Sequence, residues 1–261
     1  MIKNSNGNKA QSALLKKGLS ILLCFPNQSQ PLSQSDIAQK TGLPMSTTAR
    51  LMQALVEMDF LERDERTKLF ELGVRCYQLG VTAKYSGDLR RVALPVMQKL
   101  FDRFNETVTL YKRSGDMRVC YEQIVTSHRL KQSAYIGDEV PLWVASPGRC
   151  IMAYMDDTDI DRILANIRPY TSKTILDRDE VKNLLIEVRK TRHAISISER
   201  DEGVASVSSP ILDGNANAVG CVTLSGPEVR FSSGRIGEMI PAVIAAAQQI
   251  TEDLKEWKKE R

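Results

Sequence analysis

The sequence predicts an α+β protein with an N-terminal winged helix-turn-helix domain, a helical linker and a C-terminal α/β domain. Residues 33–58 read as a short helix, a tight turn and a second helix, and residues 59–72 read as a hairpin. After Glu106, short β-rich segments alternate with helices. The chain has 261 residues, which is enough for two domains that each bury a core.

The N-terminal segment, residues 1–11, is polar and lacks the apolar run of a signal peptide, so we expect a disordered arm. The DNA-binding domain is predicted over residues 12–75 and opens with a helix of about residues 12–25. One face of that helix carries apolar side chains that we expect to pack against the helix-turn-helix, namely Leu15, Leu19, Leu22 and Leu23.

The next helix begins with a Ser-x-x-Asp pattern at Ser33 and Asp36, in which the hydroxyl can accept a backbone N–H and the carboxylate lies in the first turn. Gly42 suits a left-handed residue at the helix end, and Pro44 suits the start of the following helix. This spacing predicts a tight helix-turn-helix.

The second helix, predicted over residues 44–58, has an apolar side formed by Leu51, Met52, Leu55 and Met58. On its other side, Ser46 and Thr47 permit a close approach to phosphates or bases, and Arg50 one turn later can reach a guanine edge. The alternative is a solvated helix face. The residues expected to contact DNA in this motif are Ser33, Met45, Ser46, Thr47, Arg50 and Gln53.

A β-hairpin is predicted from residues 59–63 and 68–72, with a charged turn at residues 64–67. Arg66 and Lys68 near its tip are expected to contact the DNA backbone or minor groove, as a wing does. A solvated charged turn is the alternative for either residue. The combination of two helices and a wing favours binding to double-stranded DNA.

The segment of residues 76–104 is predicted as a helical linker that also serves dimerisation, and residues 105–261 as the C-terminal domain. In the C-terminal domain, the predicted strands and helices alternate, which indicates an antiparallel sheet covered by helices, and there is no glycine-rich nucleotide-binding loop. We expect strands near 107–113, 118–125, 130–135 and 218–225, helices near 148–155, 158–167 and 178–190, and an amphipathic closing helix.

The charge balance is only mildly basic, with a net charge of +4 for the chain. Residues 1–75 contain ten Lys or Arg and seven Asp or Glu, a net of +3, so no polybasic surface dominates. We therefore expect two DNA-binding domains to bind an inverted-repeat operator together, as in a homodimer or tetramer. No apolar run is long enough for a membrane span, and five widely spaced cysteines favour a reducing cytoplasm.

Catalytic chemistry finds little support in the sequence. The two histidines are far apart, and no serine lies in a Gly-x-Ser-x-Gly elbow. The acidic cluster of residues 199–202 is more typical of a solvated loop. We expect no catalytic site, metal or cofactor. Two other classes remain open: a thiol-based reductase that uses Cys120, Cys150 or Cys221, and a winged-helix protein-docking module.

The order of segments along nearly the whole chain resembles the IclR family of transcriptional regulators. The similarity lies in SALLKKGLSILLCF, LSQSDIAQKTGLPMSTTARLMQALVEMDFLERD, PLWVASPGRCIMAYM and DEGVASVSSPILDGNANAVGCVTLSGP. The resemblance implies a GAF-like effector-binding domain and regulation of promoter binding, as a repressor or an activator, by a small carboxylate-bearing metabolite.

The same resemblance implies that three segments close the effector pocket. Its residues would be Trp143, Ser146, Pro147, Gly148, Arg149, Ser196, Ser206, Thr223 and Ser225. A helix that opens at Gly148 would present free N–H groups to a carboxylate, and the hydroxyls would orient it. The family usually has His at Trp143, Lys at Arg149 and an Arg-Cys pair at Ala205-Ser206, so the effector identity stays open. Ordinary capping and strand roles are the alternative for Ser146, Thr223 and Ser225.

Overall fold

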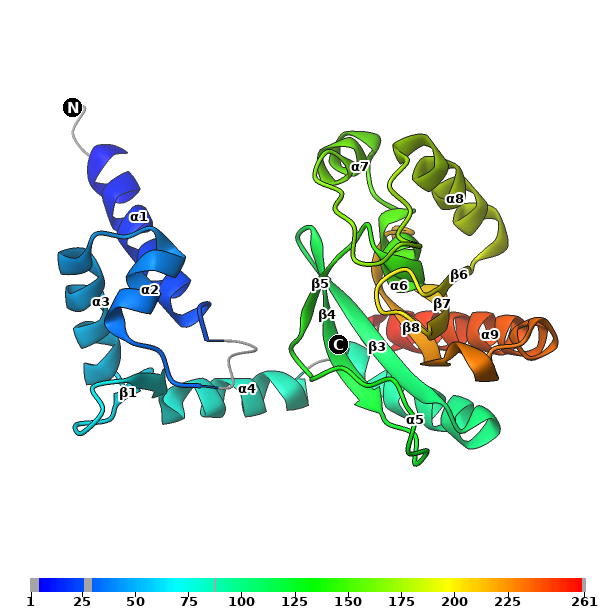
Figure 1. Cartoon of the computed structure of the whole chain (residues 1–261), viewed down its shortest axis with the longest axis horizontal. Coiled ribbons are helices and arrows are strands. Elements are labelled where there is room, and N and C mark those ends of the chain that lie inside the picture. The colour runs from blue at the N-terminus through cyan, green and yellow to red at the C-terminus, as the bar shows by residue number, and fades with distance from the viewer. Residues whose placement is uncertain (1–4, 26–29, 87, 260–261) are drawn as a thin grey trace. The chain divides into compact units, whose positions relative to one another are not determined.

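The computed structural model describes residues 5–25, 30–86 and 88–259 (Figure 1). It divides into two compact units, Met1–Ser86 and Gly87–Arg261. The division falls inside the predicted linker, because helix α4 (Val74–Ser86) belongs to the first unit and helix α5 (Asp88–Phe104) to the second.

The first unit is a three-helix bundle with a two-stranded wing. Its other elements are α1 (Ser5–Leu22), α2 (Gln34–Thr41), α3 (Met45–Glu57), β1 (Leu61–Arg63) and β2 (Phe70–Leu72). The strands pair antiparallel from Leu61 opposite Leu72 to Arg63 opposite Phe70. Its small core contains one apolar residue each from α1, α2, α3, β1 and β2 and two from the segment between α1 and α2: Ile21, Ile37, Met52, Leu61, Phe70, Phe25 and Leu32.

Helix α1 differs from its prediction in two ways. It begins at Ser5, so residues 5–11 are helical rather than disordered, and residues 1–4 lie outside the described chain. Its inward face is Gly18, Ile21, Leu22 and Phe25, which also have helical spacing, whereas Leu15, Leu19 and Leu23 are 65%, 49% and 75% exposed. The helix has two apolar sides, and the unit buries only one of them.

The second unit is built on a six-stranded antiparallel sheet in the order β5-β4-β3-β8-β7-β6. The strands are β3 (Thr107–Ser114), β4 (Met117–Ile124), β5 (Glu139–Pro141), β6 (Ala194–Ile197), β7 (Val204–Leu212) and β8 (Ala218–Pro227). The expected strand at residues 130–135 is not formed, because that segment crosses to the edge strand β5, which pairs with β4 only from Met117 to Val119.

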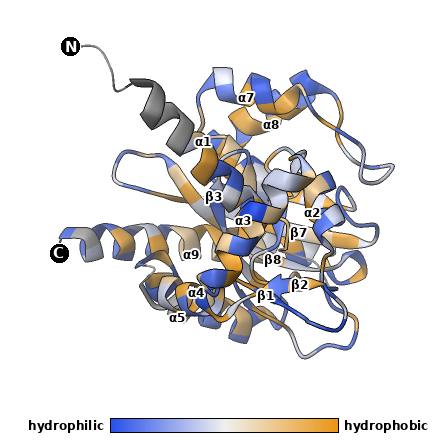
Figure 2. Cartoon of the chain, turned by 90° about the vertical axis from the view of Figure 1, so that its left-hand side faces the viewer, coloured by the Kyte–Doolittle hydropathy of each residue, from blue (hydrophilic) through white to orange (hydrophobic). Residues whose placement is uncertain are grey.

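Helices cover both faces of this sheet (Figure 1). On one face, α5 and α9 (Ser233–Lys259) pack on Val108, Leu110, Val207, Val222 and Leu224. On the other lie α6 (Ala145–Met152), α7 (Asp157–Leu164) and α8 (Arg178–Thr191), with their own apolar core. Figure 2 shows hydrophobic and hydrophilic residues mixed along α9, as expected of a helix that buries one side.

The short helix η1 (Glu228–Arg230) joins β8 to α9, and Arg230 donates to both oxygens of the fully buried Glu106 at 2.6 and 2.8 Å. None of the helices in the described part of the chain combines the length and apolar character of a membrane-spanning segment.

Candidate functional sites

The helix-turn-helix is held by local hydrogen bonds. The Ser33 hydroxyl accepts from the Asp36 N–H at 3.2 Å, and the Asp36 carboxylate accepts from the Ser33 N–H at 2.9 Å. The Ser33 hydroxyl also donates to the Asp36 carboxylate at 2.6 Å, and this bond, together with the one from the Ser33 N–H, holds the pKa of Asp36 below its ordinary value. Gly42 ends α2 with a φ of +66°. The Ser33 side chain is thus part of a capping box, and any DNA contact from it has to coexist with that bond.

Helix α3 presents one polar face. Thr48 and Met52 point into the bundle, whereas Met45, Ser46, Arg50 and Gln53 are exposed and Thr47 is half-buried. Gln53 donates to Glu57 one turn later at 3.2 Å. In the described part of the chain, no ion pair or side-chain hydrogen bond engages Arg50. The predicted contact residues therefore share the exposed face, with Arg50 as its unengaged cation.

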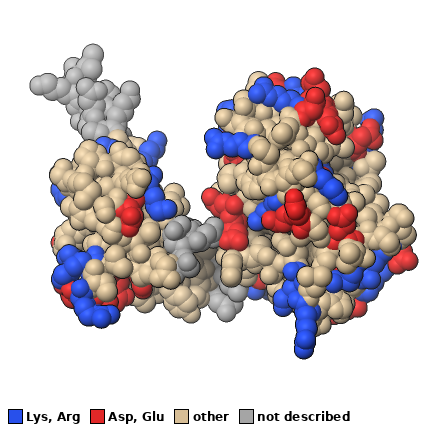
Figure 3. Space-filling model, viewed as in Figure 1, with Lys and Arg blue, Asp and Glu red and all other residues tan. Residues whose placement is uncertain are grey.

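The wing carries mixed charge. The Asp64 carboxylate accepts from the backbone N–H groups of Arg66 and Thr67 at 2.8 and 2.7 Å, which lowers its pKa and fixes the turn. Lys68 donates to Glu65 at 2.8 Å. Figure 3 shows basic and acidic side chains side by side at the lower end of this unit. Arg66 is available for a phosphate, whereas Lys68 must first leave Glu65.

In the second unit, a cavity of about 40 Å³ lies between the sheet, the start of α6 and the loop that follows β6. Five residues predicted for the effector line it: Pro147, Ser196, Ser206, Thr223 and Ser225. Eight others were not predicted: Tyr111, Arg118, Gln132, Ala145, Glu199, Arg200, Asp201 and Val204. The three segments predicted to form the effector pocket thus meet at this cavity, and residues of β3 and β4 also line it.

The start of α6 corrects one expectation. The helix begins at Ala145 rather than Gly148, so the unpaired N–H groups of its first turn belong to Ala145 and Ser146. Gly148 has a packing reason instead. A Cβ at this position would lie 1.9 Å from the Leu142 carbonyl oxygen and 2.8 Å from Nη1 of Arg118.

Buried hydroxyl groups form a continuous chain beside the cavity. Ser206 Oγ lies 2.8 Å from Ser196 Oγ and 2.7 Å from Ser146 Oγ. Ser146 Oγ in turn lies 2.8 Å from Ser208 Oγ, which is 2.9 Å from Thr223 Oγ1. Ser146 therefore does not line the cavity itself, but it is hydrogen-bonded to Ser206, which does.

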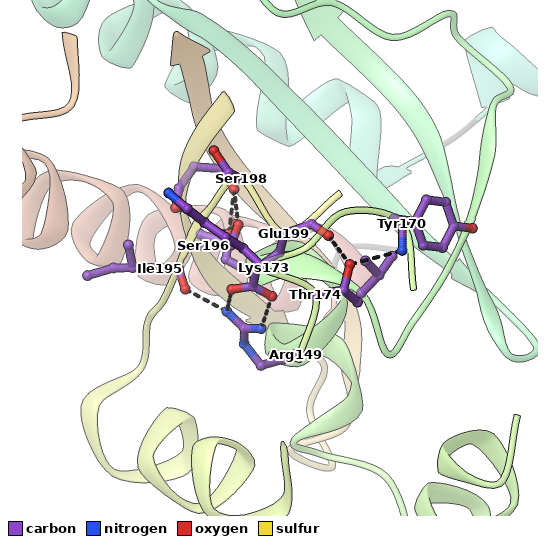
Figure 4. A network of polar contacts seen from close by, with 12 residues as sticks. Arg149, Tyr170, Lys173, Thr174, Ile195, Ser196, Ser198 and Glu199 are labelled. Atoms are coloured by element: carbon purple, nitrogen blue, oxygen red, sulfur yellow. Dashed lines mark hydrogen bonds and ion pairs between the residues drawn. The ribbon is translucent and has the colours of Figure 1, made fainter. Parts of the chain in front are cut away.

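Arg149 does not supply free charge to the cavity. Its guanidinium donates to both carboxylate oxygens of Glu199 at 2.5 and 2.8 Å and to the Ile195 carbonyl at 2.5 Å (Figure 4). The two side chains are 3% and 9% exposed, so Glu199 is not on a solvated loop as expected. Thr174 donates to the Glu199 carbonyl at 2.7 Å, which further fixes this loop.

Trp143 is also placed away from the cavity. It is 7% exposed in the core under α6, and its ring centroid lies 5.5 Å from that of Tyr170. It lines a separate surface hollow with Met117, Arg162 and Pro169. Its role here is to fill space, so an effector in the cavity would not be enclosed by it.

The thiols offer no reactive group. Cys120, Cys150 and Cys221 are buried, and burial raises the pKa of Cys120 and of Cys221 to about 12 and that of Cys150 well above its ordinary value. Within the described residues, no group of three or more His, Cys, Asp or Glu is placed to hold a metal ion.

Two family models match the chain. The model of the bacterial transcriptional regulator IclR C-terminal domain matches residues 81–252, and the IclR helix-turn-helix model matches residues 14–65. Among curated proteins, the chain is 24% identical over 241 residues to the transcriptional repressor IclR of Escherichia coli, covering 91% of this chain and 88% of the relative. It is 25% identical over 231 residues to the E. coli transcriptional repressor AllR, covering 87% and 85%.

Solved structures agree on the fold. A regulator from a Silicibacter species superposes with a TM-score of 0.85 at 23% identity, covering 92% of this chain and 96% of that one. One from a Rhodococcus species gives 0.75 at 28%, covering 93% and 98%. An IclR homologue from Microbacterium hydrocarbonoxydans, solved with 4-hydroxybenzoate, gives 0.77 at 20%, covering 92% and 98%.

Proposed function

The chain belongs to the IclR family of bacterial transcriptional regulators, and from that premise we propose that it binds an inverted-repeat operator as a homo-oligomer under the control of a small carboxylate. Its relatives are transcriptional repressors, not enzymes. The high pKa values of the buried thiols disfavour the reductase alternative as well.

The exposed face of α3 carries the DNA-binding part of this proposal. Arg50 is an exposed cation with no ion pair or side-chain hydrogen bond to any described residue, one turn from the N-terminus of the helix, where recognition helices contact base edges. Arg66 and Lys68 on the wing would contact phosphates, which adds affinity without sequence preference. Met45, Ser46, Thr47 and Gln53 share the surface, and Ser33 lies at the start of α2.

A titration of DNA affinity tests these roles. A duplex selected from a randomised library and an unselected duplex are titrated at several salt concentrations with the parent, Arg50→Ala and Arg66→Ala. We expect Arg50→Ala to lose about 1–3 kcal/mol on the selected duplex only. Arg66→Ala should weaken both duplexes alike and reduce the salt slope by about one. Equal losses on both duplexes for Arg50→Ala would refute base reading.

We propose a homodimer or tetramer because a single DNA-binding domain of modest charge contacts only a few base pairs, so two domains are needed for tight binding. The exposed leucines of α1 support this proposal, since a second copy would cover them. We also propose that the protein acts in the cytoplasm, which its five widely spaced cysteines favour.

The effector proposal rests on the cavity of the second unit. The hydroxyls of Ser206, Thr223 and Ser225 line it, and polar groups that converge in a small cavity suit a small polar ligand. The carboxylate ligand of the Microbacterium homologue supports the same chemical class. Pro147 and Ser196 complete the proposed set, with Ser146, Gly148 and Arg149 behind the wall. Trp143 is proposed only to shape the core beneath α6.

A further inference from the structure

Arg118 on β4 is a buried cation that faces the cavity. It is 1% exposed and lines the same cavity as the serine and threonine hydroxyls. Its Nη1 donates to the carbonyl oxygens of Pro141 and Val144 at 2.7 and 2.8 Å. Its Nε is also buried and has no hydrogen-bond partner among the described residues. A buried guanidinium N–H without an acceptor is costly, so the site is prepared for an acceptor that the protein does not supply.

The charges around the cavity do not balance. Arg149 pairs with Glu199 at 2.5 Å and Arg200 pairs with Asp201 at 3.6 Å, which leaves Arg118 as the third guanidinium with two carboxylates already engaged. Burial lowers the pKa of Arg118 to about 10, so the group is still protonated at neutral pH. The Tyr111 ring lies 5.3 Å from the Arg118 guanidinium carbon and offers a π face but no negative charge. One positive charge remains uncompensated.

The size of the cavity restricts its ligand. A volume of about 40 Å³ admits only a few non-hydrogen atoms unless the loop of residues 198–203 moves. The remaining wall is formed by Gln132 and by Tyr111, Ala145, Pro147 and Val204, and the last four suit a short apolar body. These features together favour a compact anion with a single charge.

We propose that Arg118 binds the carboxylate of the effector and restricts it to compact monoanions. The inference rests on the proposed function, because it names the group that holds the proposed acid. Arg118 lies on β4, outside the three segments implied by family resemblance. A carboxylate oxygen at Nε would give Arg118 its missing acceptor and neutralise its charge.

Calorimetric titration of the full-length protein tests the proposal. The probes are acetate, its neutral isostere acetamide and the dianion oxalate. We expect acetate to bind at least about tenfold more tightly than either of the others. Arg118→Met, which keeps the length of the side chain, should lose about 10- to 100-fold in acetate affinity. Arg118→Lys should retain part of the affinity, because it keeps the charge but not the planar donor pair.

Arg113→Met is the matched control. Arg113 lies opposite Arg118 in the β3–β4 register and does not line the cavity, so its loss removes the same charge from the same hairpin. This variant should bind acetate as the parent does. The ¹⁵N–¹H signal of Arg118 Nε in the parent provides a second measurement that needs no folded variant, and acetate but not acetamide should shift it.

The possible results distinguish a failure of the role of Arg118 from a failure of the proposed function. If Arg118→Met binds acetate as tightly as the parent, or if acetamide binds as well as acetate, the role of Arg118 is wrong and the proposed regulator function stands. If no monocarboxylate binds while the selected duplex still does, both Arg118 and the proposed effector class are wrong. If the parent does not distinguish selected from unselected duplexes, the proposed function itself fails.

Discussion

At the scale of single residues, the buried pair of Arg149 and Glu199 shows how this chain departs from what its sequence pattern suggests. A cation beside a predicted pocket looks like a ligand contact, and an acidic run looks like a solvated loop. The structure instead joins the two across 50 residues of sequence. Spacing along the chain indicates which residues share an element, but it contains no information on which distant charges meet.

Breaking this pair should destabilise the second unit. Arg149→Met leaves Glu199 buried without its partner, and we expect a loss of about 3–5 kcal/mol in the free energy of unfolding. Urea denaturation measures it. The double variant Arg149→Met with Glu199→Met should recover part of the loss, because no orphaned charge remains. Lys190→Met removes an exposed pair with Glu187 and should leave the midpoint nearly unchanged. A double variant less stable than the single one would contradict this account.

Gly148 offers a second test at this scale. Gly148→Ala places a methyl group against the Leu142 carbonyl and should cost about 1–3 kcal/mol or more through overpacking. Gly237→Ala in α9 meets nothing within 4 Å and should stabilise the protein by about 0.5–1 kcal/mol, because alanine is the better helix former. Thermal unfolding of both variants should therefore shift in opposite directions. Two shifts of the same sign would contradict the proposed packing constraint.

At the scale of elements, periodicity predicts the helices well and their orientation less well. The reader helices, the wing and the antiparallel C-terminal sheet are confirmed. Helix α1 was oriented wrongly because both Leu15-Leu19-Leu23 and Ile21-Leu22-Phe25 have helical spacing, and a pattern alone does not say which side meets the bundle. Similarly, Arg118 was missed because alternation on β4 is compatible with either face pointing to water.

The outward row of α1 leads to a prediction about assembly. Leu15→Ser with Leu19→Ser should weaken self-association and DNA affinity together, because the apolar area that a second copy would cover is removed. The fold of the unit should persist, since both side chains are at least 49% exposed. Analytical ultracentrifugation and DNA titration measure the two effects, with Lys16→Ser on the same helix as the control. Unchanged mass and unchanged affinity in the leucine variant would exclude α1 from the interface.

At the scale of the whole molecule, each apolar core lies within one unit. The core of the first unit ends at Phe70, and the two cores of the second begin at Leu89 and at Tyr111. We therefore expect the fragment of residues 88–261 to unfold cooperatively and to bind the same small acids as the full chain, without DNA binding. Calorimetry and duplex titration of the fragment test this. A fragment that folds but has lost acid binding would show that the first unit contributes to the effector site.

The sequence predicted this two-part organisation, because family resemblance extends over nearly the whole chain. Five of the residues it proposes for the effector, from three distant segments, line the cavity. Tyr111, Arg118 and Gln132 were not foreseen, since β3, β4 and the segment beyond them reach the cavity only through strand pairing that no local pattern specifies. Long-range register thus sets the limit of prediction here.

The buried hydroxyl chain from Ser196 through Ser206, Ser146 and Ser208 to Thr223 has a sense of direction. Each hydroxyl has one hydrogen to donate and can accept two, so with all four bonds formed one hydroxyl donates to none of the others. A ligand atom that accepts the Ser206 hydrogen makes Ser206 that hydroxyl, so Ser196 and Ser146 both donate to it, Ser208 donates to Ser146 and Thr223 donates to Ser208. A carboxylate in the cavity would therefore turn every hydroxyl of the chain toward Ser206, whereas a ligand that only donates to Ser206 would leave the alignment open.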